Sequence, residues 1–143
     1  NEAFTRDARI VFLDDSIVRG TQLKDNVVKL RECGVKEVHI RIACPPLIYP
    51  CCFLNFSTSR STFDLFARRV IRDLEGTSEL TDEILKPYSD PDSEKYKEMV
   101  RVMCQHLQLD SLQFQRLDDL VKAIGLPKEQ LCTHCWDNSS YME

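Results

Sequence analysis

The first part of the chain has a pattern of apolar positions that predicts a strand followed by a helix. Ile10 to Leu13 is an unbroken apolar run of strand length, which is typical of a strand buried on both faces. A helical stripe follows and predicts a helix from Thr21 to Cys33, which Gly34 is placed to end. The stripe consists of Leu23, Val27 and Leu30.

The next segment changes to a period of two. Residues 38 to 42 alternate between apolar and polar side chains, which predicts a second strand, and Pro45-Pro46 is expected to stop it. A strand, a helix and a further strand in this order form a right-handed βαβ unit with parallel strands. The chain is therefore expected to have an α/β fold that begins with a parallel sheet.

Beyond residue 61 the pattern is mainly helical. Gly125 closes the last stripe, and the polar stretch 75–93 reads as an insertion. Arg68, Arg69 and Arg72 are interpreted as a solvated helix face. The expected elements are helices over 62–74, 81–85, 94–107 and 117–124, and a short strand over 112–114.

Composition and charge exclude several classes of protein. The 143 residues suit one soluble domain, with 43% apolar and 29% charged residues. The net charge of −4 gives no support to a nucleic-acid partner, and no run approaches the roughly 20 apolar residues of a membrane span. No signal peptide opens the chain, so a cytoplasmic location is expected. Because few strands follow the first one, we expect the chain to have lost upstream strands of a larger sheet.

Two adjacent acids follow the first strand. Asp14 and Asp15 stand at its carboxyl end, where ligands bind in open α/β sheets. Their mutual repulsion would be relieved by a ribose diol or a magnesium ion. Residues 16–21 then lead into a helix, whose first N–H groups and positive dipole end receive phosphate. The alternative is an ordinary capped turn with solvated acids.

The string from Leu13 to Thr21 resembles the signature of type I phosphoribosyltransferases, and most of all that of glutamine phosphoribosylpyrophosphate amidotransferases. The resemblance implies that Asp14 and Asp15 contact the ribose hydroxyls and the Mg²⁺–diphosphate of phosphoribosyl diphosphate. It also implies that residues 16–21 hold the 5-phosphate, with Gln22 replacing a frequent second threonine. The implied substrate-binding residues are Asp14, Asp15, Ser16, Ile17, Val18, Arg19, Gly20 and Thr21.

The cysteines form a second candidate site. Seven cysteines, an odd number, favour thiols or metal ligands over a secreted disulfide framework. Cys132-Thr133-His134-Cys135 has a spacing that suits either a metal or a redox pair. Cys33 and Cys104 fall within predicted helices and are interpreted as core residues, while Cys44 is interpreted as structural.

Two further segments resemble the same amidotransferase family. Residues 44–51 are similar to its Ser-Pro-Pro-Ile-x-x-Pro-Cys segment, and residues 110–125 to the segment before its closing Cys-x-x-Cys. The resemblance implies that Cys51, Cys132 and Cys135 bind a [4Fe–4S] cluster, with a fourth ligand from upstream of the chain. Zn²⁺ remains an alternative metal, and Cys52 an alternative ligand.

The resemblance implies the carboxy-terminal part of a phosphoribosyltransferase domain. Residues 1–61 would be the end of its α/β core, and residues 62–143 a helical segment with the cysteine tail. The parent would be a homo-oligomer that makes 5-phosphoribosylamine from phosphoribosyl diphosphate and glutamine-derived ammonia in the first step of purine (IMP) biosynthesis. A glutaminase domain outside the chain would supply the ammonia, and the chain alone is expected to be inactive. No catalytic residue is assigned with certainty within it.

Two other functions stay open. A salvage phosphoribosyltransferase that takes a nucleobase would share the loop but leave the terminal cysteine pair unexplained. A metal-stabilised regulatory module with a vestigial loop would need no turnover. Product analysis with ammonia against nucleobases separates the two enzymes, and metal analysis separates both from the module.

Overall fold

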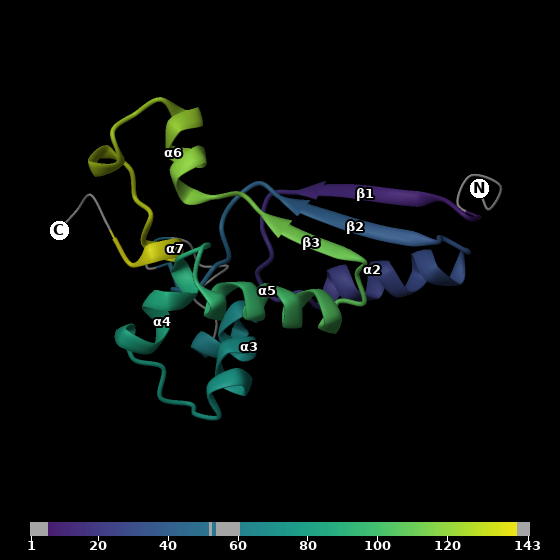
Figure 1. Ribbon diagram of the computed structural model, residues 1–143, viewed down its shortest axis with the longest axis horizontal. Coiled ribbons are helices and arrows are strands. Elements are labelled where there is room, and N and C mark those ends of the chain that lie inside the picture. The colour runs from purple at the N-terminus through teal and green to yellow at the C-terminus, as the bar shows by residue number, and fades with distance from the viewer. Residues whose placement is uncertain (1–5, 52, 54–60, 140–143) are drawn as a thin grey trace.

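The structure, a computed structural model, describes residues 6–51, 53 and 61–139. Three parallel strands form a sheet in the order β1-β2-β3, with β1 at Arg9–Asp14, β2 at Glu37–Ile42 and β3 at Ser111–Phe114. The sheet lies above α2 and α5 in Figure 1, and the remaining helices gather beyond the carboxyl ends of the strands. The predicted α/β class with a parallel sheet is confirmed.

The strand–helix–strand unit forms as the sequence predicts. Helix α2 spans Thr21–Glu32, and β1 pairs with β2 in parallel along its whole length. Gly34 has φ 82°, and the N–H of Val35 donates to the carbonyl of Leu30 at 3.1 Å, so the left-handed glycine turns the chain out of the helix. Buried Val27 on the α2 stripe packs against Val38 of β2.

The alternation along β2 is also confirmed. Val38, Ile40 and Ile42 are buried, and they belong to the core clusters that residues of the helices complete. The core is completed by residues of later elements, chiefly Val70, Ile71, Leu85, Met99, Met103, Leu107 and Leu112. The sheet therefore buries one face within the described part of the chain.

Strand β1 differs from its prediction of burial on both faces. Val11 and Leu13 have exposed fractions of 60% and 84%, and each pairs in register with a residue on the open face of β2. The reason is topological: among the described residues β1 is an edge strand, and β2 is its single neighbour. An unbroken apolar run indicates that a strand can be buried on both faces. Whether it is buried depends on which strands and helices pack against it.

The long helix expected over 62–74 is divided. A 3-10 turn at Thr62–Asp64 and helix α3 at Phe66–Glu75 are separated by Leu65, which is extended at φ −70° and ψ 123° and is almost fully buried. Helix α4 spans Asp82–Ser89 and extends past the expected 81–85. Helix α5 spans Glu94–His106 and agrees with its prediction. Both α3 and α4 contact α5, so the polar insertion contributes to the core.

The last part of the chain returns to the segment after β2. Helix α6 spans Leu117–Ile124 and ends at left-handed Gly125, as expected. A 3-10 turn at Lys128–Gln130 and the short helix α7 at His134–Asp137 follow. Strand β3, from the second predicted segment, pairs with β2 of the first. The division of the chain into residues 1–61 and 62–143 stays a prediction. None of the helices among the described residues is long and apolar enough to cross a membrane.

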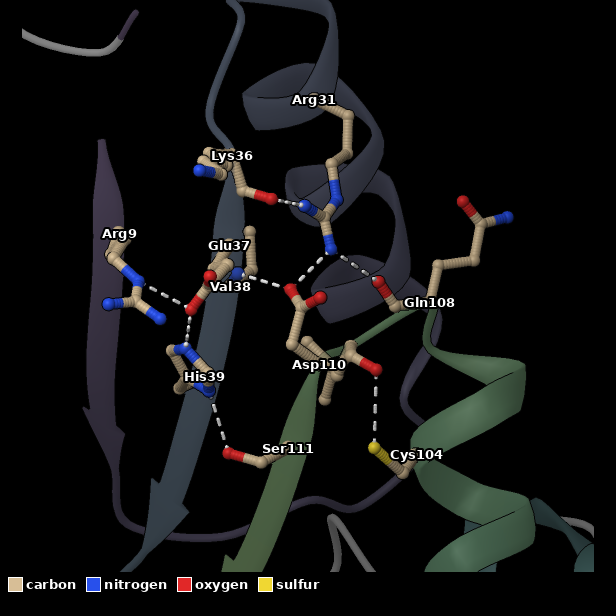
Figure 2. A network of polar contacts seen from close by, with 11 residues as sticks. Arg9, Arg31, Lys36, Glu37, Val38, His39, Cys104, Gln108, Asp110 and Ser111 are labelled. Atoms are coloured by element: carbon tan, nitrogen blue, oxygen red, sulfur yellow. Dashed lines mark hydrogen bonds and ion pairs between the residues drawn. The ribbon is translucent and has the colours of Figure 1, made fainter. Parts of the chain in front are cut away.

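A polar network ties β3 to the first unit (Figure 2). Arg31 at the end of α2 donates to the Asp110 carboxylate at 2.6 Å, and the same carboxylate oxygen accepts the N–H of Val38 at 2.6 Å. On the open face of the sheet, Glu37 bridges Arg9 and His39, at 2.7 and 3.0 Å. The Val38 N–H and, secondarily, Arg31 hold the pKa of Asp110 below its usual range.

Candidate functional site

The carboxyl end of β1 opens into a concavity of about 760 Å³. It is lined by Asp14, Asp15, Ser16, Ile17, Val18, Arg19, Gly20, Thr21, Gln22, Leu23 and Asn26. All eight predicted substrate-binding residues are therefore brought to one surface hollow. We call residues 14–21 the phosphate loop, after the ligand that the sequence resemblance predicts for them. Its position at a strand end and a helix start is the geometry that binds ligands in open α/β sheets.

Asp14 and Asp15 begin the phosphate loop with both side chains exposed. The carbonyl of Asp14 accepts the N–H of Ala43 at 2.9 Å, which fixes this strand end to the end of β2. The N–H of Asp15 donates to the Asp14 carboxylate at 3.0 Å. Two exposed carboxylates on an anchored backbone fit hard cations and hydroxyl groups, which prefer oxygen ligands.

Gly20 is the N-cap of α2 and has φ 73°. A Cβ atom built on it would lie 3.1 Å from the ring of Phe66, so both the backbone and the space favour glycine. No side chain caps this helix in the described structure. The first-turn N–H groups from Thr21 onward therefore have no side-chain acceptor, and an anion would supply one.

Helix α3 holds the phosphate loop from its other side. The N–H of Phe66 donates to the carbonyl of Val18 at 2.8 Å, and the Arg69 guanidinium donates to the carbonyl of Arg19 at 2.6 Å. Ile17 is buried in the core, so its side chain anchors the loop and its backbone alone can face a ligand. The loop is therefore fixed before any ligand arrives.

Arg68 and Arg69 are not the solvated face expected from the sequence. Both are half-buried, and Arg68 donates to the carbonyl of Ile48 at 2.8 Å. Sequence reasoning missed Arg69 and Phe66 as supports of the loop. The one available signal was the arginine cluster itself. Its hydrogen-bond partners are backbone carbonyls, and the pattern of side chains along the sequence does not reveal them.

The tail cysteines lie beside the segment that follows Pro45-Pro46. The N–H groups of Ile48 and Tyr49 donate to the carbonyl of Cys135 at 2.9 and 3.0 Å. Burial and, to a smaller extent, the nearby thiols of Cys51 and Cys132 together raise the pKa of the Cys135 thiol to about 12, and Cys51 contributes in part through a hydrogen bond. Cys51 therefore lies near Cys135 although more than eighty residues separate them, and Cys132 is a second neighbour of Cys135.

The metal assignment itself stays a prediction. Across residues 6–51, 53 and 61–139, no three His, Cys, Asp or Glu side chains are arranged to hold a metal ion. Cys51 is buried, Cys135 half-buried and Cys132 exposed, so the last would have to turn toward the other two. The alternative ligand Cys52 lies outside the described residues.

The remaining cysteines are placed as follows. Cys33 is exposed, so its prediction as a core residue is wrong: it is the C-cap of α2 and follows the last helical residue, Glu32. Cys104 is half-buried and packs against the core, as expected. Cys44 donates to the carbonyl of Pro45 at 3.3 Å, and burial raises its thiol pKa to about 11.

Comparison with known proteins identifies the relatives of the chain. No protein-family model matches it. It is 31% identical over 139 residues to the amidophosphoribosyltransferase of Mycobacterium bovis, which covers 96% of this chain and 21% of that protein. It is 63% identical over 43 residues to the Pyrococcus horikoshii enzyme of the same name, which covers 30% of this chain and 10% of that one.

A solved structure described as the allosteric regulatory enzyme of purine biosynthesis superposes with a TM-score of 0.65. The match has 25% sequence identity and covers 97% of this chain and 24% of that one. This chain is a relative of the amidophosphoribosyltransferases. The similarity extends over both the phosphate loop and the helical tail, and it does not favour the salvage alternative. The chain spans about a fifth or less of the length of the amidophosphoribosyltransferases named here.

Proposed function

We propose that the chain provides the phosphoribosyl diphosphate subsite of an amidophosphoribosyltransferase. The whole enzyme would displace diphosphate from phosphoribosyl diphosphate with ammonia and release 5-phosphoribosylamine. A glutaminase domain outside the chain would supply the ammonia. The observation that carries the proposal is the pair of exposed acids at the end of β1, next to the uncapped start of α2.

The two ends of the phosphate loop would contact different parts of the substrate. The backbone N–H groups and hydroxyls of residues 16–21 would receive the 5-phosphate at the amino end of α2. Asp14 and Asp15 would accept the ribose hydroxyls and orient C1 toward the incoming ammonia. Such a site acts by positioning the reactants and by stabilising charge as the diphosphate leaves.

Magnesium fits the acid end of this loop. Asp14 and Asp15 present adjacent exposed carboxylates without an ion-pair partner among the described residues. Bound Mg²⁺ would offset the charge of the leaving diphosphate. The chain's own contribution is to hold the two carboxylates on a fixed strand end, through the bond from Ala43 to Asp14.

We also propose that Cys51, Cys132 and Cys135 bind a [4Fe–4S] cluster once Cys132 turns toward the other two, with the fourth ligand from another part of the parent. Support comes from the hydrogen bond between Cys51 and Cys135 and from the nearby thiol of Cys132. A cation would stabilise their thiolates, which repel one another without it. Zn²⁺ stays the alternative. Seven cysteines also suit a reducing cytoplasm, which we propose as the location of the parent.

The decisive experiment is a product assay with the intact protein. Phosphoribosyl diphosphate and Mg²⁺ are supplied with ammonia, or with adenine, guanine or hypoxanthine, and diphosphate release is followed. The proposal expects diphosphate release when ammonia is the acceptor and none when a nucleobase is the acceptor. Release with a nucleobase would establish the salvage activity instead, and no release with any acceptor would leave a binding module.

A further inference from the structure

A second concavity adjoins the phosphate loop on the side of α3 and α5. It measures about 370 Å³, within the range of small-molecule sites. We call it the basic pocket. It is lined by Arg19, Gly20, Thr21, Lys24, Phe66, Arg69, His106 and Leu107. Arg19, Gly20 and Thr21 line both concavities, so the backbone of the loop forms the wall between them.

The charges in the basic pocket have one sign. Arg19, Lys24 and Arg69 are cationic, and no acidic residue among those that the structure describes lines the pocket. Arg19 lies 3.8 Å from Asp64, but both side chains are well exposed and such a pair contributes little in water. Lys24 and Arg69 form no ion pair with a carboxylate in the part of the chain that the structure describes.

Arg69 is held in place without being neutralised. Its guanidinium donates to the carbonyls of Phe63 and Asp64, both at 3.1 Å, and to that of Arg19 at 2.6 Å. It also lies over the Phe66 ring, 5.4 Å from the centroid. Cations that are merely solvated have mobile side chains. A fixed guanidinium repels the cations next to it, and a bound anion would relieve this repulsion and form charged hydrogen bonds with the guanidinium.

We propose that the basic pocket is a second anion site, which binds one phosphate group while the phosphate loop is occupied. Arginine and lysine are the side chains that recognise phosphate, and the pocket places them on three different elements around an open volume. The ligand is a phosphate ion or the phosphate of a small metabolite. The anion site itself uses neither acid of the loop nor the cysteines, and only the simultaneous occupation of the phosphate loop rests on the proposed function.

Lys24 and His106 are the positions to change, because Arg69 also supports the loop. The full chain is titrated with inorganic phosphate at constant ionic strength and followed by amide NMR, with and without saturating ribose 5-phosphate. We expect saturable shifts at Lys24, Phe66 and Leu107 that persist when ribose 5-phosphate occupies Ser16 and Asn26. Lys24→Gln with His106→Gln should weaken phosphate binding about fivefold.

The matched control is Lys97→Gln with Arg101→Gln, which removes charge from the exposed side of α5, where both residues pair with glutamates. Its phosphate affinity should equal that of the unaltered chain. An equal loss in the control would reduce the effect to general electrostatics and overturn the site. Displacement of phosphate by ribose 5-phosphate would also overturn it, because one ligand would then span both concavities. Phosphate binding here without any ribose 5-phosphate binding would refute the proposed function alone.

Discussion

The phosphate loop and the cysteine region reach their geometry by different routes. The loop is eight consecutive residues, and its shape follows from a strand end, a left-handed glycine and a helix start. The cysteine region joins Cys51 to Cys132 and Cys135, which helix α7 and the segment after β2 bring together. The difference teaches that the first site is encoded locally, while the second depends on the tertiary structure. Changes in the two regions should therefore have different consequences.

The largest effect is expected from the acid pair. Asp14→Asn with Asp15→Asn in the intact protein should lower ammonia-dependent turnover by more than about tenfold, because each tenfold corresponds to ~1.4 kcal/mol of transition-state stabilisation. The fold should persist, since both side chains are exposed and their mutual repulsion is removed. Steady-state kinetics and circular dichroism measure the two. Turnover within about twofold of the unaltered enzyme would exclude these acids from the site.

The next effect is at Gly20. Gly20→Val combines a left-handed backbone with a Cβ contact of 3.1 Å to the Phe66 ring, so the loop must move and binding of ribose 5-phosphate should weaken about tenfold. Calorimetry measures the affinity.

Gly76→Val is the matched control for Gly20→Val. Gly76 has φ 66° and nothing within 4 Å of a Cβ, so it carries the backbone strain without the contact. Its affinity for ribose 5-phosphate should be unchanged. Equal losses in both variants would attribute the effect to general destabilisation.

A substitution in the cysteine region should loosen the carboxy-terminal tail without changing the affinity for phosphate. The intact protein, purified without oxygen, should contain iron and sulfide, and Cys132→Ser should remove both. The tail after Gly125 should then be cleaved faster by protease, because a metal clip closes a long chain segment. Cys33→Ser, at an exposed position on α2, is the control and should retain the cluster. Zinc without iron would keep the ligands and change the metal.

The smallest effect concerns Asp110, which lies outside both regions. Its pKa is lowered mainly by the N–H of Val38 and also by Arg31, so its contribution to stability is complete above the unfolded pKa of about 4 and is lost as the pH falls below it. Asp110→Asn keeps an acceptor for Val38 but removes the charge. Urea unfolding should show a loss of about 1 kcal/mol at pH 7 and a smaller difference as the pH falls below about 4. A difference in unfolding free energy between the two proteins that does not change with pH would contradict an ionic contribution of Asp110 to stability.

The sequence predicted the local part of the fold and not the contacts between distant parts. The first strand, α2 and β2 were predicted because apolar periodicity and Gly34 act over a few residues. The exposure of Val11 and the interruption at Leu65 depend on which elements lie nearby, which periodicity does not contain. The residues of the phosphate loop line one concavity, and their assignment to the substrate stays a prediction. The support from Arg69 was missed because its partner is a carbonyl fifty residues away.

The network around Asp110 also has a consequence for the order of folding. Strand β1, α2 and β2 are close in sequence and can form early, whereas β3 must arrive across the segment that carries α3, α4 and α5. Asp110 contacts both the end of α2 and the second residue of β2, so it can bind only after that unit exists. Docking of β3 should therefore be a late step whose rate falls when Asp110 is replaced, after the unit of β1, α2 and β2 has already formed.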